Sequence, residues 1–95
     1  MTSGTKRVGD DVSLKDEAPS VDILTAYDEA HMAIYLQLLY GSAEGHSVAR
    51  LAREMFAIDA GIEPARAEKI VASHLRRARW LSDAGRHHFL AQESA

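Results

Sequence analysis

The sequence predicts an all-α domain of three helices, and two observations carry this prediction. Apolar residues recur at the three- and four-residue spacing of an amphipathic helix in three separate segments. Residues that favour helix starts or helix ends flank each of these segments. We therefore expect no sheet of three or more strands. The predicted helices span residues 26–40, 48–56 and 64–84.

An arm that cannot form a core precedes these helices. Residues 1–19 contain few apolar side chains and several charge-dense stretches, such as residues 15–17. Such a segment cannot bury enough apolar surface to offset the entropy that it would lose on ordering. We predict a disordered acidic arm over residues 1–20, a folded domain over residues 21–90 and a frayed tail over residues 91–95.

The first predicted helix is bounded by residues typical of helix caps. Thr25, with Asp28 three residues later, has the spacing of a capping box. Gly41 stands where a left-handed residue ends many helices. Apolar residues cover most of the girth of this helix, so we expect it to be the central, buried one. Its inner face comprises Tyr27, His31, Ile34 and Leu38, widened by Met32, Tyr35, Leu36 and Leu39.

The second and third helices follow the order of a helix-turn-helix domain. Ser47 is the expected N-cap of the short second helix, and Pro64 suits the first position of the longer third helix. Gly85 is the expected stop, after which Phe89 and Leu90 would fold back onto the core. The connector is longer than the usual three or four residues, which favours a variant of the motif. The predicted inner faces are Val48, Leu51, Ala52, Met55 and Phe56 in the second helix and Ala67, Ile70, Val71, His74, Leu75, Ala78 and Leu81 in the third.

The outer face of the third helix is the candidate binding surface. At 100° per residue, six side chains fall within one sector of about 100° on the side away from the predicted core. Guanidinium groups pair with phosphates or carboxylates, and an exposed tryptophan is a typical anchor of protein interfaces. The alternative is a solvated face in which the tryptophan packs under Phe89. The predicted partner-binding residues are Arg66, Lys69, Ser73, Arg76, Arg77 and Trp80.

The charge distribution favours a protein partner over DNA. The net charge of −3 combines −5 in residues 1–47 (three basic, eight acidic), +3 in residues 48–86 (eight basic, five acidic) and −1 from Glu93. A DNA reader would place its arginines against guanine and phosphate. The third helix has no Asn or Gln, and the acidic arm could shield its positive charge. DNA binding by this chain alone is therefore not expected.

Sequence features that carry catalysis or metal binding are not found. The chain has no cysteine, so it has no disulfide or thiolate site. Its five histidines lack the H-E-x-x-H spacing, and His31 and His74 fall on inner helix faces, where hydrogen-bonded core roles are expected. No glycine-rich phosphate loop, secretory signal or membrane-length apolar run is present. We expect a cytoplasmic protein that is not an enzyme and uses no cofactor.

Residues 27–90 resemble a small proteobacterial family of helix-turn-helix variants, formerly a domain of unknown function. No single motif is diagnostic, but the order and spacing of the shared motifs are specific. The resemblance covers about two-thirds of the chain and is strongest in the third helix. It rests on Tyr27-Asp28-Glu29-Ala30-His31, Leu36-Gln37-Leu38-Leu39, Glu44-Gly45-His46-Ser47, Ala52-Arg53, Phe56-Ala57-Ile58-Asp59, Glu63-Pro64-Ala65-Arg66-Ala67, Ser73-His74-Leu75-Arg76-Arg77-Ala78-Arg79-Trp80-Leu81, Gly85 and His88-Phe89-Leu90.

The resemblance implies a role in controlling the transfer of integrative and conjugative elements. Small acidic-armed members are similar to antiactivators of mesorhizobial symbiosis islands. This implies a protein, expected to be a monomer, that binds and inhibits a LuxR-type quorum-sensing regulator and an excision activator of the helix-turn-helix family. The alternatives are a small DNA-binding transcription factor that uses the third helix and a subunit of a larger complex.

Overall fold

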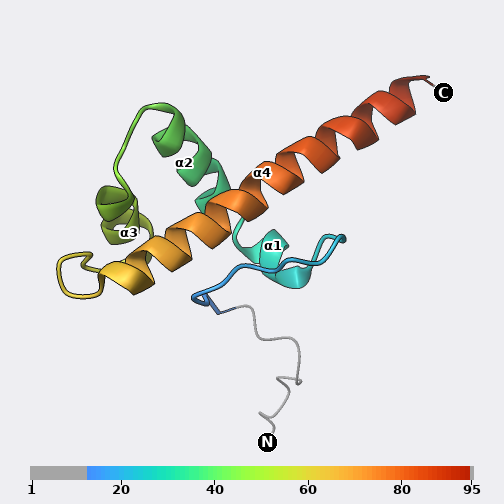
Figure 1. The fold of residues 1–95 in the computed structure, drawn as a ribbon. Helices are drawn as coiled ribbons and strands as arrows, with labels where there is room; N and C mark the ends of the chain where they lie inside the picture. Colours follow the sequence, from blue (N-terminus) through green and yellow to red (C-terminus); the bar gives the residue numbers. More distant parts are fainter. Residues whose placement is uncertain (1–12, 95) are drawn as a thin grey trace, which may run out of the picture.

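The computed structural model of the chain describes the backbone of residues 13–94 and the side chains of residues 13–84. The regular elements of this part are all α-helices, which confirms the predicted all-α class. The helices that span residues 32–43 and 48–56 pack against the long C-terminal helix and against each other (Figure 1). The helices are α1 (Ala26–Ala30), α2 (Met32–Ala43), α3 (Val48–Phe56) and α4 (Pro64–Ser94).

The first predicted helix is in fact two helices, because the backbone breaks at His31. The predicted capping box at the start of α1 is confirmed: Thr25 Oγ1 accepts the Asp28 N–H at 3.1 Å, and Asp28 Oδ2 accepts the Thr25 N–H at 2.9 Å. His31 leaves helical geometry, with φ −119° and ψ 22°. Its ring Nδ1 lies 2.8 Å from the carbonyl oxygen of Tyr27. The His31 N–H also donates to this carbonyl oxygen, at 3.1 Å.

The predicted left-handed cap at Gly41 is wrong, because α2 continues to Ala43. Gly41 is buried, and a Cβ atom there would lie 2.7 Å from Leu51 Cδ2. A side chain at this position would require Leu51 to shift, because α2 and α3 approach each other closely here. The left-handed residue of the loop is Gly45, with φ +85°.

Helix α3 has the predicted bounds and the predicted N-cap. Ser47 Oγ accepts the Arg50 N–H at 3.1 Å. The helix ends at Ala57, a non-glycine residue in the left-handed conformation with φ 57° and ψ 37°. The next amide, from Ile58, bonds back to the Ala52 carbonyl at 3.1 Å, as in a Schellman motif. This turn directs the Ile58 side chain into the core.

Helix α4 begins at Pro64 as predicted, but it does not stop at Gly85. It continues to Ser94, so the predicted return of Phe89 and Leu90 onto the core is wrong. One glycine costs a helix about 1 kcal/mol relative to alanine, which is too little to end it among residues that favour helix. Ala95 lies outside the described residues.

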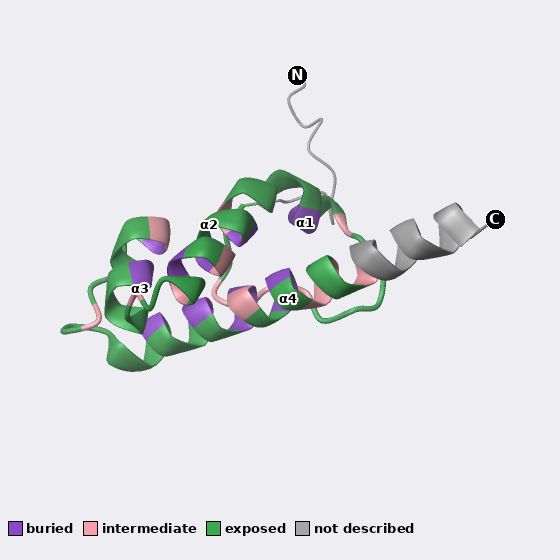
Figure 2. Cartoon of the chain, turned by 90° about the horizontal axis from the view of Figure 1, so that it is seen from above, coloured by how far each residue is buried: buried purple, intermediate pink, exposed green. Residues whose placement is uncertain are grey.

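The apolar core lies where α2, α3 and α4 face one another (Figure 2). This confirms most of the inner faces predicted from periodicity, although Met32, Leu36 and Val48 are exposed and Leu75 and Leu81 of α4 are only half-buried. The core residues are Leu38, Leu51, Ala52, Phe56, Ile58, Ala67, Ile70 and Val71.

Candidate protein interface

The six residues predicted to form the partner-binding surface do not share one environment. Arg66, Lys69 and Arg76 are exposed, and Trp80 is half-buried. Ser73 and Arg77 are buried, with exposed fractions of 7% and 4%, so the prediction that they lie on a free surface is wrong. The helical wheel placed both residues away from the apolar core. It could not show that a polar layer, formed by α1 and the segment before it, covers this flank of α4.

A buried ion pair between Arg77 and Asp28 joins α4 to α1. Arg77 donates from Nε to Asp28 Oδ1 at 3.0 Å and from Nη2 to Asp28 Oδ2 at 2.6 Å. Burial alone would raise the pKa of Asp28, but hydrogen bonds from Arg77, Thr25 and Tyr35 outweigh it and hold this pKa well below its ordinary value. Asp28 is therefore an anion, and both of its carboxylate oxygens accept hydrogen bonds from the Arg77 guanidinium.

Arg77 also ties down the chain that precedes α1. Its remaining guanidinium N–H groups donate to the carbonyl oxygens of Val21 and Ile23, at 2.5 and 2.7 Å. The guanidinium carbon lies 4.3 Å from the ring centre of Trp80, in cation–π geometry. Arg77 is buried and thus holds α1, the strap and α4 together through four hydrogen bonds.

Residues 13–24, which we call the strap, lie along the face of α4 that the sequence singled out. Asp16 Oδ2 pairs with Arg66 Nε at 3.1 Å. The Ser73 hydroxyl accepts the Ala18 N–H at 3.2 Å. These contacts correct the prediction of a disordered arm for residues 13–20, because polar contacts with α4 replace the missing apolar anchors. Residues 1–12 of the predicted arm lie outside the described residues.

A hydrogen-bonded chain beneath the strap fixes the tautomer of His74. His74 Nδ1 lies 2.7 Å from the carbonyl oxygen of Ile70, which can only accept, so Nδ1 carries the proton. His74 Nε2 therefore accepts from the Tyr27 hydroxyl at 2.5 Å, and that hydroxyl accepts the Lys15 N–H at 3.1 Å. Burial lowers the pKa of His74 and keeps the ring neutral. The predicted hydrogen-bonded core role is confirmed for His74, whereas His31 is only half-buried.

An apolar groove runs between α4, α2 and the end of the strap, and sequence reasoning did not identify it. It consists of two hollows that share Met32 and Leu81. Ile23 and Leu36 on its walls are 68% and 56% exposed, which is unusual for such large apolar side chains. We call this feature the α2–α4 groove. Its lining residues are Asp22, Ile23, Leu24, Met32, Tyr35, Leu36, Leu39, Ala78, Trp80, Leu81, Ser82 and Ala84.

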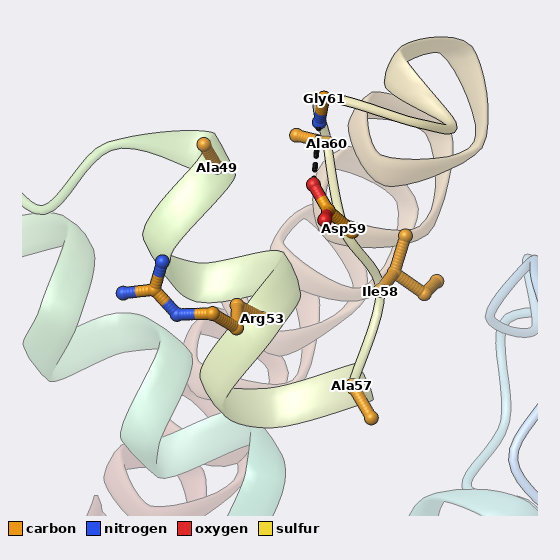
Figure 3. Close-up of a pocket in the computed structure, with 7 residues that line it drawn as sticks. All are labelled: Ala49, Arg53, Ala57, Ile58, Asp59, Ala60 and Gly61. Carbon is orange, nitrogen blue, oxygen red and sulfur yellow. Dashed lines mark hydrogen bonds between the residues drawn. The ribbon is translucent and has the colours of Figure 1, made fainter.

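A separate hollow, outside the α2–α4 groove, lies between α3 and the connector that leads to α4 (Figure 3). Asp59 Oδ1 accepts the Gly61 N–H at 2.8 Å, so this carboxylate shapes the turn. The guanidinium of Arg53 is the one cation that lines the hollow. A single cation beside small side chains provides no acid–base pair, and we assign this hollow no chemistry. Its lining residues are Ala49, Arg53, Ala57, Ile58, Asp59, Ala60 and Gly61.

Metal centres and membrane spans are two other kinds of site with recognisable structural features. In this part of the chain, no three or more His, Asp or Glu side chains gather as a metal site would require. Among the same residues, no helix combines the length and apolar character that crossing a membrane requires.

Comparisons with known proteins do not assign the chain to a family. No family of known proteins matches the sequence, and no curated protein is similar to it. The resemblance to conjugative-element regulators therefore stays a prediction.

Proposed function

We propose that this chain is an antiactivator that works by binding proteins in the cytoplasm. In this proposal it binds and inhibits a LuxR-type quorum-sensing regulator and an excision activator of the helix-turn-helix family. It thereby represses excision and conjugative transfer of an integrative and conjugative element. It needs no catalytic residue and no cofactor for this role.

The observation that carries the proposal is the strap on the outer face of α4. A helix-turn-helix reader inserts this face of its second helix into the major groove and holds the backbone with free cationic groups. Here Arg66 is paired with Asp16, and Arg77 is paired with Asp28. Arg66 and Arg77 could bind a duplex only if the strap and its acidic side chain were displaced. This arrangement supports a protein partner over DNA.

The exposed α2–α4 groove supports the same proposal. Large apolar side chains that stay in water at one place mark sites of protein association. The end of the strap and Trp80 line part of the groove, so it adjoins the strap-covered face.

A second candidate, direct DNA binding, is favoured by two exposed cations. Lys69 and Arg76 of α4 are both exposed, and the order α3, connector, α4 is that of a helix-turn-helix domain. These groups could hold phosphates even if the strap stays in place.

A reconstitution with purified proteins tests the proposal. We expect the chain to co-elute with a LuxR-type activator in gel filtration after nuclease treatment. We also expect it to reduce the activator–promoter band in a gel shift and to form no band of its own at physiological salt. Tight, sequence-specific DNA binding by the chain alone would instead establish the second candidate.

A further inference from the structure

We propose that protonation of His74 releases residues 13–18, which we call the outer strap, from α4, and that the hydroxyl of Tyr27 transmits this change. The inference goes beyond the proposed function, because it concerns what holds the strap in place. It stands whether or not the chain is an antiactivator.

The strap is attached to the rest of the molecule in two different ways. Its inner end is held by the buried guanidinium of Arg77, which donates to the carbonyl oxygens of Val21 and Ile23. The outer strap is held instead by the Asp16–Arg66 ion pair, whose side chains are 47% and 46% exposed, and by two amide hydrogen bonds. The outer strap can therefore leave α4 while the inner end stays in place.

The two amides of the outer strap donate to hydroxyl groups that contact His74. The Lys15 N–H donates to the Tyr27 hydroxyl oxygen at 3.1 Å, and the Ala18 N–H donates to Ser73 Oγ at 3.2 Å. The Tyr27 hydroxyl lies 2.5 Å from His74 Nε2, and Ser73 Oγ lies 3.3 Å from His74 Nδ1. Each amide is therefore joined to the fully buried His74 ring through a single hydroxyl group.

The direction of the hydrogen bond between Tyr27 and His74 depends on the charge of the ring. In the neutral ring Nδ1 carries the proton, so Nε2 accepts the hydroxyl hydrogen of Tyr27. The hydroxyl oxygen accepts the Lys15 N–H at the same time. In the imidazolium, Nε2 also carries a hydrogen and becomes a donor. The two described partners of the Tyr27 hydroxyl are then both donors, and the hydroxyl hydrogen loses its acceptor.

The loss of this acceptor favours release of the outer strap. A buried donor without a partner costs more free energy than an exposed ion pair contributes, so the Asp16–Arg66 pair cannot hold the strap in place over it. When Lys15 moves away, water can reach the Tyr27 hydroxyl and accept its hydrogen. Protonation of His74 and release of the outer strap therefore favour each other.

Ionisable groups from the strap, α1 and α2 surround the His74 ring. The Tyr35 hydroxyl donates to Asp28, whose charge is balanced by Arg77, so this ion pair adds no net charge. The groups beside the ring are Asp16 of the strap, Tyr27 and His31 of α1 and Tyr35 of α2, and α3 packs the Phe56 ring against the imidazole.

These surroundings set the pH range in which release is expected. Burial lowers the pKa of His74 from 6.5, and repulsion from His31 acts in the same direction. The Asp16 carboxylate opposes this shift, but it is half-exposed and paired with Arg66. Release admits water to the ring, so the pKa of His74 rises toward 6.5 in the released state. Protons therefore bind the released state more tightly, and acidification below pH 6.5 shifts the strap toward release.

Release changes what the outer face of α4 presents to solvent. It separates Arg66 from Asp16 and uncovers the hydroxyl of Ser73. Proton binding at His74 thus controls how much of this face is open.

Nuclear magnetic resonance of the full wild-type chain tests the inference without any substitution. The imidazole ¹⁵N shifts report the charge of His74, and the ¹H–¹⁵N NOE values of the Lys15 and Ala18 amides report the mobility of the outer strap. Val71, which is buried on α4, reports the state of the helical bundle. The chain is titrated between about pH 8 and pH 5, where histidine changes its charge.

We expect the NOE values of Lys15 and Ala18 to fall with the same midpoint as the neutral fraction of His74, while that of Val71 stays constant. The ratio of released to docked strap should rise at least about tenfold. A ring that is still neutral at about pH 5 would overturn the inference, and so would a strap that stays rigid after His74 is charged. Loss of order in Val71 at the same midpoint would also overturn it, because the whole bundle would then be unfolding.

Two substitutions separate the Tyr27 hydroxyl from other sources of pH dependence. Tyr27→Phe removes the acceptor of the Lys15 N–H, so the outer strap should be mobile already at about pH 7 and show no further step. His31→Gln is the matched control, since the His31 ring lies 4.2 Å from the Tyr27 ring but bonds to the Tyr27 carbonyl oxygen and not to its hydroxyl. This variant should keep the step. A step that survives in Tyr27→Phe, or that is lost in His31→Gln, would refute the role of the hydroxyl. The wild-type titration decides the inference even if either variant fails to fold.

Discussion

Arg77 shows how one side chain can organise a surface from below. Its guanidinium satisfies Asp28, two strap carbonyls and the face of Trp80 at once. Its neighbour Arg76 is exposed and has a structural role in none of these contacts. The two arginines are adjacent in sequence, yet Arg77 is buried beside the Asp28 carboxylate and Arg76 is exposed to solvent.

The first prediction compares these two arginines. Arg77→Met removes the partner of the buried Asp28 carboxylate, so we expect it to lower the free energy of unfolding by about 3–5 kcal/mol. Arg76→Met should change it by less than about 0.5 kcal/mol, because its side chain is in water. Urea unfolding followed by circular dichroism measures both values. Similar values for the two variants would show that the Arg77–Asp28 pair is not buried in solution.

The second prediction concerns the acid limb of stability. The pKa of Asp28 is lower in the folded state than its ordinary value of 3.8, so the folded state binds fewer protons. Its contribution is therefore complete above pH 3.8 and is lost as the pH falls below it. We expect the melting temperature of Asp28→Asn to be lower than that of the wild type at pH 7. The difference should shrink as both proteins are acidified, and a constant difference would contradict the assigned charge state.

The third prediction concerns His74. Its pKa is lowered from 6.5 by burial, so its stabilising contribution is present above pH 6.5 and is lost as the pH falls below that value. We expect imidazole ¹⁵N shifts at pH 7 to report the neutral Nδ1–H tautomer. The unfolding free energy of the wild type should also fall between about pH 7 and pH 5 more steeply than that of His74→Gln. An Nε2–H tautomer would reverse the hydrogen-bonded chain described above.

At the scale of elements, some helix ends have residues that favour the observed cap conformation, and one end has a residue that does not. Ser47 and Thr25 cap their helices with side-chain oxygens. Ala57 instead ends α3 in the left-handed region, where a Cβ atom is strained.

The fourth prediction uses this mismatch. Ala57→Gly should raise the free energy of unfolding by about 0.5–1 kcal/mol, because glycine adopts the left-handed conformation without that strain. Ala72→Gly is the control, since Ala72 is exposed within α4. This substitution should lower the free energy of unfolding by about 1 kcal/mol. Thermal or urea unfolding distinguishes the two signs. A loss in both variants would mean that Ala57 is not left-handed in solution.

At the scale of the whole molecule, the exposure of two helix faces differs from what the sequence predicted. These are the outer face of α4 and the inner face of α2. The strap covers Ser73 and Arg77 on the outer face of α4, whereas Arg66, Lys69 and Arg76 stay exposed. The nominal inner face of α2 is partly open. Leu38 of that helix is fully buried, whereas Leu36 is 56% exposed and lines the groove. The core therefore uses one side of α2 and leaves another side for a partner.

The fifth prediction tests this division of α2. Leu38→Ala should cost about 2–5 kcal/mol, because it leaves a cavity in the core. In a domain with a total stability of about 5–15 kcal/mol, this loss is a large fraction. Leu36→Ala should cost much less, since its side chain is mostly in water. Equal losses, measured by urea unfolding, would contradict the described packing of α2.

Structural features that depend only on neighbouring residues were correctly predicted from the sequence. Helical spacing located the three helical regions, and side-chain hydroxyl groups identified the N-caps Thr25 and Ser47. The missing N–H of proline identified Pro64 as the first residue of α4. Spacing also identified most of the α4 face that meets the core, from Ala67 to Ala78. These features follow from interactions within about one helical turn, which a local pattern records.

Which outer helix faces are exposed to solvent depends on contacts between residues that are far apart in the sequence, and only the tertiary structure shows these contacts. Arg77 and Asp28 are 49 positions apart, and Ser73 and Ala18 are 55 positions apart. Helical periodicity cannot register such contacts, so Ser73 and Arg77 were expected on the surface and the strap was expected to be disordered. The α2–α4 groove was missed for the same reason. An apolar stripe is equally apolar whether or not another element covers it, and coverage is a property of the assembled fold.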